Sequence, residues 1–247
     1  MPKIYFEKID KDLCDISKKP EPASRLEHPL WWEDIPRYND NKESDIPFLR
    51  HRQNATIKNC PSVNDSMNFG YVVYLPFDIY INAEDPENIY WYVPEINTKN
   101  LDDRKDKDNL VGWNSENDIH SFYIPEGYHK VLLKLNTLWG IKTDPGYSCW
   151  MTQPMYRKDL PLLAMDGVID TDVYPSRFPS MFFVKSGFVG IVKSSTPILQ
   201  VIPFKREEYF SEIVELDIEN IKKNHALESS TFSNFYKKVF WSRKKFN

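Results

Sequence analysis

Residues 167–172, Gly-Val-Ile-Asp-Thr-Asp, are the part of the sequence best suited to chemistry. A glycine such as Gly167 lets the backbone approach a ligand closely. The carboxylate of Asp170 could orient a water molecule as a general base, and Tyr174 could stack on a sugar. The simpler interpretation is that Asp170 and Asp172 accept hydrogen bonds from backbone amides of a local turn.

Two adjacent tryptophans and one arginine are further candidates for ligand binding. Trp31 and Trp32 lie in a polar stretch that contains several prolines, and their rings could form a stacking platform. We favour the alternative that they cover one end of the core, because large aromatic side chains are usually buried. Arg157 could hold an anion.

The sequence predicts neither a metal site nor a cofactor. Asp118, His120 and His129 could imitate the facial triad that holds iron, but the usual His-x-Asp order is reversed. The charged stretch 97–118 lacks the glycine and the terminal glutamate of a calcium-binding EF-hand loop. The three cysteines form no CxxC pair, so we expect free thiols at Cys14, Cys60 and Cys149.

Short strands, many of them separated by glycine and proline, dominate the middle of the chain. Their spacing predicts an antiparallel sandwich or barrel, not a βαβ architecture. The expected strands are residues 3–9, 71–75, 77–81, 89–93, 121–124, 130–135, 139–143, 147–152, 160–165, 167–171, 180–184, 187–192 and 198–204. Residues 97–118 are expected to be a loop. Residues 60–69 are expected to be a helix with Pro61 at its first position and Gly70 as its left-handed stop.

The chain is expected to end in short helices. Asp217 suits the cap of a helix over residues 217–227, and a second helix follows Ser229 or Ser230. This second helix carries an apolar stripe at helical spacing, formed by Phe232, Phe235, Tyr236, Val239 and Phe240. We expect the stripe to dock on the chain's own core or on a sister subunit, with the nearby lysines in solvent. The expected divisions are an irregular segment 1–58 that packs on the core, a β domain 59–205 and a helical tail 206–247.

Composition excludes some classes of protein. Aromatic residues make up 15% of the chain, which favours sheet. A formal charge of −4 makes nucleic acid an unlikely partner for the whole chain. No apolar run approaches the roughly 18–20 residues of a membrane span, and the charged N-terminus lacks the apolar region of a signal peptide. We therefore expect a cytoplasmic protein with no membrane contact.

Residues 134–204 resemble the trimeric dUTPase and dCTP deaminase superfamily. The superfamily's G-x-I-D-x-D hairpin is matched by residues 167–172, with Tyr174 displaced by one position, and its later Ala-Gln pair by Leu199-Gln200. The resemblance implies a jelly-roll-like fold and a trimer. It also implies a catalytic role for Asp170 and ligand-binding roles for Gly167, Asp172, Tyr174 and Gln200.

Several groups that bind a triphosphate in that superfamily are absent from this sequence. The segment 153–157 (QPMYR) replaces a serine-containing phosphate motif, and only Arg157 in it could bind phosphate. Val72 replaces an early aspartate, and no glycine follows Gly190 to form the closing C-terminal arm. The resemblance therefore supports a fold more than an activity.

The whole chain resembles more closely an uncharacterised family found in bacteria and in tailed phages of cyanobacteria. The matching segments are TIKNCPSVNDSMNFGY, KTDPGYSCWMTQP, GVIDTD and TPILQVIPFKRE. This resemblance implies a phage source, and so a role in the host cytoplasm or the virion, but it assigns no catalytic residue.

Three functions remain open from the sequence. We favour a non-enzymatic binding or regulatory module on a dUTPase-like scaffold, which binds a small molecule or a protein and assembles as a homo-oligomer. The second is an enzyme that acts on a nucleotide or another small metabolite, with Asp170 activating water and Arg157 holding an anion. The third is a phage structural protein that assembles through its sheet edges.

Overall fold

The computed structural model describes residues 1–9, 11–39, 54–93, 111–114, 124–174, 180–230 and 235–247. Two compact units divide the chain between them. The first contains Met1–Leu26, Gly70–Arg206 and Phe246–Asn247, and the second contains Glu27–Phe69 and Glu207–Lys245. Each unit is assembled from separate stretches of sequence.

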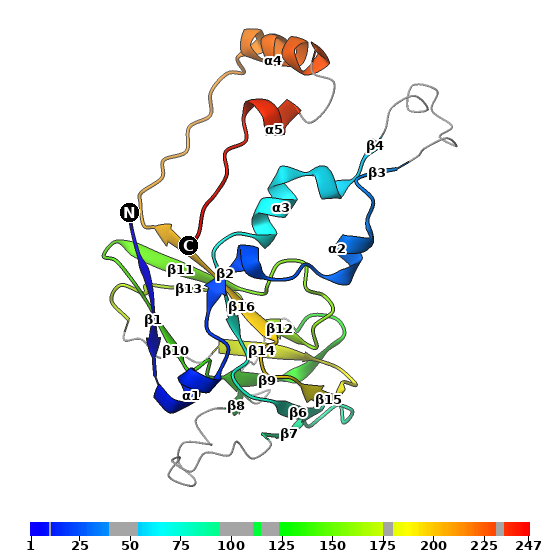
Figure 1. Cartoon of the computed structure of the whole chain (residues 1–247), viewed down its shortest axis with the longest axis vertical. Coiled ribbons are helices and arrows are strands. Elements are labelled where there is room, and N and C mark those ends of the chain that lie inside the picture. Colours follow the sequence, from blue (N-terminus) through cyan, green and yellow to red (C-terminus); the bar gives the residue numbers. More distant parts are fainter. Residues whose placement is uncertain (10, 40–53, 94–110, 115–123, 175–179, 231–234) are drawn as a thin grey trace. The chain divides into compact units, whose positions relative to one another are not determined.

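Antiparallel β-strands build the first unit (Figure 1). A five-stranded sheet has the order β13 (Gly167–Ile169), β11 (Tyr147–Thr152), β16 (Pro197–Lys205), β5 (Tyr71–Tyr74) and β2 (Glu21–Pro22). A four-stranded sheet has the order β12 (Leu162–Ala164), β14 (Ser180–Lys185), β9 (Tyr128–Leu135) and β8 (Val111–Asn114). Smaller sheets pair β15 (Val189–Val192), β6 (Ile79–Asn82) and β7 (Tyr90–Tyr92), and β1 (Ile4–Lys8) with β10 (Trp139–Thr143). The helix α1 (Lys11–Ile16) and a single 3-10 turn at Ala23–Arg25 complete the unit.

The prediction of a mostly antiparallel β fold is confirmed. Among the described strands the sheets are open, and none closes into a barrel. The loop predicted at 97–118 is wrong at its described part, because Val111–Asn114 forms β8 and pairs with β9. Burial of Val111 and pairing with a distant strand outweigh the polar local sequence there. The remainder of that stretch, and most of the strand expected at 121–124, lie outside the described residues.

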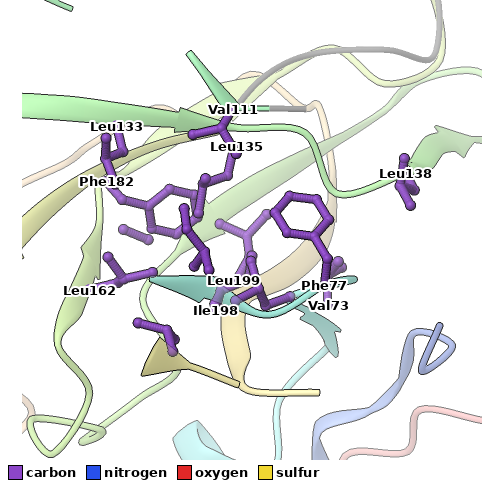
Figure 2. Packing of buried hydrophobic residues seen from close by; sticks show 14 of the residues in the cluster. Val73, Phe77, Val111, Leu133, Leu135, Leu138, Leu162, Phe182, Ile198 and Leu199 are labelled. Carbon is purple, nitrogen blue, oxygen red and sulfur yellow. The ribbon is translucent and has the colours of Figure 1, made fainter. Parts of the chain in front are cut away.

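The core of the first unit joins the five-stranded and four-stranded sheets. Val73 and Leu199 come from the former, and Leu133, Leu135 and Phe182 from the latter, all within one buried cluster (Figure 2). Inward-facing side chains of two sheets thus share one apolar interior, which is how such sheets bury their hydrophobic faces.

The second unit is smaller and contains most of the helices. Its elements are α2 (Leu30–Asp34), β3 (Tyr38–Asn39), β4 (Asn54–Ala55), a 3-10 turn (Ile57–Asn59), α3 (Pro61–Met67), α4 (Ile218–Ser230) and α5 (Phe235–Val239). Both predicted helix signals are present. Pro61 opens α3, with Gly70 at a φ of 76° beyond its end, and the Asp217 side chain caps α4 by accepting from Asn220 N at 3.0 Å. In the described part of the chain, every helix is too short or too polar to cross a membrane.

Candidate functional site

The segment 167–172 forms the edge of the five-stranded sheet and then a turn. Gly167–Ile169 pairs with β11 as strand β13. The chain turns at Asp170, whose backbone oxygen accepts hydrogen bonds from the N–H groups of Val173 (3.1 Å) and Tyr174 (2.9 Å). The segment is thus an edge strand followed by a turn, and not a hairpin, because β13 pairs with β11 while β12 and β14, its neighbours in sequence, belong to the four-stranded sheet. Both aspartates follow the edge strand.

The two aspartates are held by one arginine, an arrangement that we call the Arg206 clamp. Arg206 donates from both terminal nitrogens to the Asp172 carboxylate, at 2.7 and 2.5 Å. The second oxygen of Asp172 also accepts from Gly146 N at 2.8 Å. Asp170 accepts from the Ser148 hydroxyl at 2.6 Å and lies 3.1 Å from Arg206. Asp172 is 5% exposed at its side chain and Asp170 is 57% exposed, so the pairing is tightest at Asp172.

The clamp keeps both carboxylates ionised. The hydrogen bond from Ser148, followed by that from Arg206, holds the pKa of Asp170 below its usual value. The hydrogen bond from Arg206, followed by that from Gly146 N–H, does the same to the pKa of Asp172. A general base works best when its pKa lies near the operating pH, and these lowered pKa values disfavour taking up a proton. The arrangement suits a charge-paired structural contact.

The other residues predicted to bind a ligand have structural partners of their own. Arg157 forms a two-pronged pair with the carboxylate of Asp159, at 2.8 to 3.1 Å. Gln200 is buried in β16 and accepts a hydrogen bond from Met155 N at 2.9 Å. Tyr174 is exposed beside the turn that follows β13. Among the predicted residues, the structure thus brings together Gly167, Asp170, Asp172 and Tyr174 at this edge strand and turn.

The two tryptophans belong to α2 in the second unit. Trp32 is buried and Trp31 is partly exposed, and their rings meet edge to face with centroids 5.8 Å apart. Trp32 is thus buried, as large aromatic side chains usually are, and Trp31 retains an accessible ring.

A shallow hollow of about 280 Å³ lies elsewhere in the first unit, lined by residues that include Glu84, Tyr128, His129 and Lys130. Small-molecule sites usually measure about 300–1,000 Å³. His129 is buried beside it and is satisfied by the backbone. Its Nδ1 accepts from Val131 N at 3.0 Å, so its Nε2 donates to the Asp85 carbonyl at 2.8 Å. Both ring nitrogens of His129 are thus hydrogen-bonded. Asp118 and His120, the other two residues of the iron triad considered from sequence, lie outside the described residues.

A feature that the sequence analysis missed is the segment that joins β16 to α4. Residues 207–217, which we call the acidic arm, form neither helix nor strand and appear as the extended orange stretch leading into α4 (Figure 1). Five large apolar side chains on it are 71% to 103% exposed, namely Tyr209, Phe210, Ile213, Val214 and Leu216. The signal was present in the sequence as apolar and acidic residues interleaved through EEYFSEIVELD.

Comparison with known proteins assigns no family. The chain matches no protein-family model and no curated protein. It is similar to the solved structure of a mutant dUTPase from phage phi11 of S. aureus, with 11% identity over 56% of this chain and 97% of that chain. The TM-score of 0.27 is too low to establish a common fold, so the description of the fold rests on the strands themselves.

Proposed function

We propose that this protein is a non-enzymatic binding module that contacts another protein through the acidic arm. The single observation that carries the proposal is the exposure of Tyr209, Phe210 and Ile213, which are 83%, 91% and 103% exposed along one extended segment. Large apolar side chains gathered on one exposed segment typically mark a site of interaction with another macromolecule. For the scaffold we propose the jelly-roll-like sandwich of the dUTPase superfamily, which the hairpin sequence supports.

The surroundings of Asp170 and Asp172 support a binding role over catalysis. Both carboxylates pair with Arg206, and Arg157 is paired with Asp159. An enzyme acting on a nucleotide through Asp170 would need a base able to accept a proton and a cation available for phosphate. Here Asp170, the candidate base, is paired with Arg206, and Arg157, the candidate phosphate-binding cation, is paired with Asp159.

The chemistry of the arm indicates the kind of surface that it binds. The arm contains no Lys, Arg or His, and its five acidic residues are Glu207, Glu208, Glu212, Glu215 and Asp217. A complementary surface would offer apolar side chains bordered by basic ones. The partner that we propose is therefore a protein surface that is apolar and basic.

A binding assay with designed peptides tests this chemistry. A fluorescein-labelled amphipathic helix of leucine and lysine should bind the full chain, whereas matched helices of leucine and glutamate or of serine and lysine should not. The triple variant Phe210→Ser, Ile213→Ser, Leu216→Ser should bind the first peptide about tenfold more weakly or worse, a loss of about 1.4 kcal/mol or more. The control Leu30→Ser removes an exposed apolar side chain of α2 and should leave binding unchanged. Equal anisotropy changes for wild type and the triple variant would refute the proposal.

A further inference from the structure

We propose that the partner of the acidic arm is a second copy of this chain, whose basic segment it binds to form a closed homo-oligomer. The basic segment is residues 235–245, which comprise α5 and the six residues after it. The inference rests on the proposed function, since it names the protein surface that the arm contacts.

The two segments are opposite in charge and alike in apolar content. The basic segment contains no Asp or Glu, and its five basic residues are Lys237, Lys238, Arg243, Lys244 and Lys245. The arm has five acidic residues and no basic one. Opposite charges around an apolar centre favour encounter and fix the register of two surfaces.

The described part of the apolar stripe is only half covered by its own chain, and Phe232 lies outside the described residues. Tyr236, Val239 and Phe240 are 45% to 53% exposed, although they lie at the spacing of one helical face. The alternatives expected from sequence for this stripe were docking on its own core or on a sister subunit. Because the stripe is still about half exposed, we favour docking on a sister subunit.

The basic segment of the same chain does not cover the apolar side chains of the arm. Both belong to the second unit, yet Phe210 and Ile213 on the arm are 91% and 103% exposed. If the basic segment of the same chain covered the arm, these side chains would be buried. A contact between two copies would bury the arm of one and the basic segment of the other. Because each chain offers both segments, every arm in a closed oligomer can be paired with a basic segment.

The basic segment is held in place, which reduces the cost of ordering it on binding. Trp241 Nε1 donates to the Asp65 carboxylate of α3 at 2.7 Å, and Lys244 Nζ donates to the same oxygen at 2.9 Å. The arm itself continues directly into α4, where the Asp217 side chain caps the helix. Preorganised segments lose less conformational freedom when they associate.

The available surface is large enough for a stable interface. An aromatic side chain buries about 150–250 Å², so Tyr209 and Phe210 from two copies would contribute roughly 600–1,000 Å². The three aliphatic residues of each arm and the stripe on each basic segment add to this area. Stable interfaces bury about 1,200–2,000 Å² in total, and the combined surfaces reach that range.

Sedimentation and light scattering on the full chain test the inference. The wild type should be oligomeric at roughly 100 µM and dissociate on dilution or at high salt. Dilution shifts the association equilibrium toward monomers, and salt screens the charge pairs between the two segments. The variant Lys237→Glu, Lys238→Glu should raise the dissociation constant about tenfold or more. Adding Glu212→Lys and Glu215→Lys to that variant should restore association, whereas adding them to the wild type should weaken it.

Matched controls separate this contact from general effects of charge. Lys222→Glu, Lys223→Glu reverses the same charges on exposed positions of α4 and should leave association unchanged. A wild type that stays monomeric at roughly 100 µM, or an oligomer that neither the arm nor the basic-segment variants affect, overturns the inference. The inference is also overturned if the protein stays monomeric and its basic segment binds anionic vesicles or duplex DNA. If the chain is monomeric but the leucine-lysine peptide still binds the arm, the proposed function stands and the assignment of the partner fails.

Discussion

Gly70 offers a sharp test of the packing at the start of β5. Its φ of 76° lies in the left-handed region, and a Cβ added there would stand 2.2 Å from the backbone oxygen of Val201 in β16. Forcing an L-residue into this conformation costs about 1–2 kcal/mol. Because the clashing atom belongs to the backbone of a paired strand, relief needs a shift of the sheet, and overpacking of this kind adds about 1–3 kcal/mol. Gly70→Ala should therefore destabilise the protein by about 2–5 kcal/mol.

Gly127 provides the matched control for this prediction. Its φ is 82°, yet an added Cβ would meet no atom within 4 Å. Gly127→Ala should therefore cost only the conformational component, about 1–2 kcal/mol. Urea unfolding followed by tryptophan fluorescence gives the free energies of unfolding, and the slopes should stay equal if both changes act on the folded state. A Gly70→Ala variant that loses no more stability than Gly127→Ala would show that the approach of Val201 is not as close as described.

Three further results are expected. Arg206 holds the pKa of Asp172 below its usual value, so the Arg206–Asp172 pair stabilises the folded protein at neutral pH, and this contribution is lost as the pH falls through the lowered pKa. The melting temperature of wild type should therefore drop more steeply below about pH 4 than that of Asp172→Asn. Gln200→Ala should destabilise the protein by about 2 kcal/mol or more, because Met155 N–H loses its acceptor and a cavity opens. A loss under about 0.5 kcal/mol in urea unfolding is typical of surface sites and would contradict a structural role for Gln200. A panel of deoxynucleoside triphosphates with Mg²⁺ should show no turnover, and any turnover abolished by Asp170→Asn would sink the non-enzymatic proposal.

The strands could be predicted from sequence where local signals agree. Residues 139–143 and 147–152 are strands with the expected bounds, because Pro145 and Gly146 turn the chain between two aromatic and β-branched runs. Gly146 takes a φ of 84°, as such a turn requires. The strand β8 could not be predicted, since it exists through pairing with β9, and pairing between distant segments leaves little trace in composition.

A strand beginning at Gly167 was expected from sequence and is present as β13, but the partners of the two aspartates that follow it were not foreseen. Ser148 lies 22 residues before Asp170, and Arg206 lies 34 residues after Asp172. A motif of six residues carries no information about which distant cation will meet its carboxylates. The same limit applies to Gln200, whose acceptor role depends on a backbone N–H 45 positions away.

The Arg206 clamp also bears on how the acidic arm can bind. Arg206 is the residue that precedes the arm, and its backbone N–H donates to the Gly146 carbonyl at 2.9 Å while its side chain holds Asp172. The arm therefore leaves the sheet from a fixed point at Arg206 and continues into α4, which Asp217 caps. A segment anchored at its root samples fewer conformations than one that follows a loose stretch of chain, so it loses less entropy on binding. Carboxylates that the sequence presents as candidate catalysts thus support the binding proposal by positioning the root of the arm.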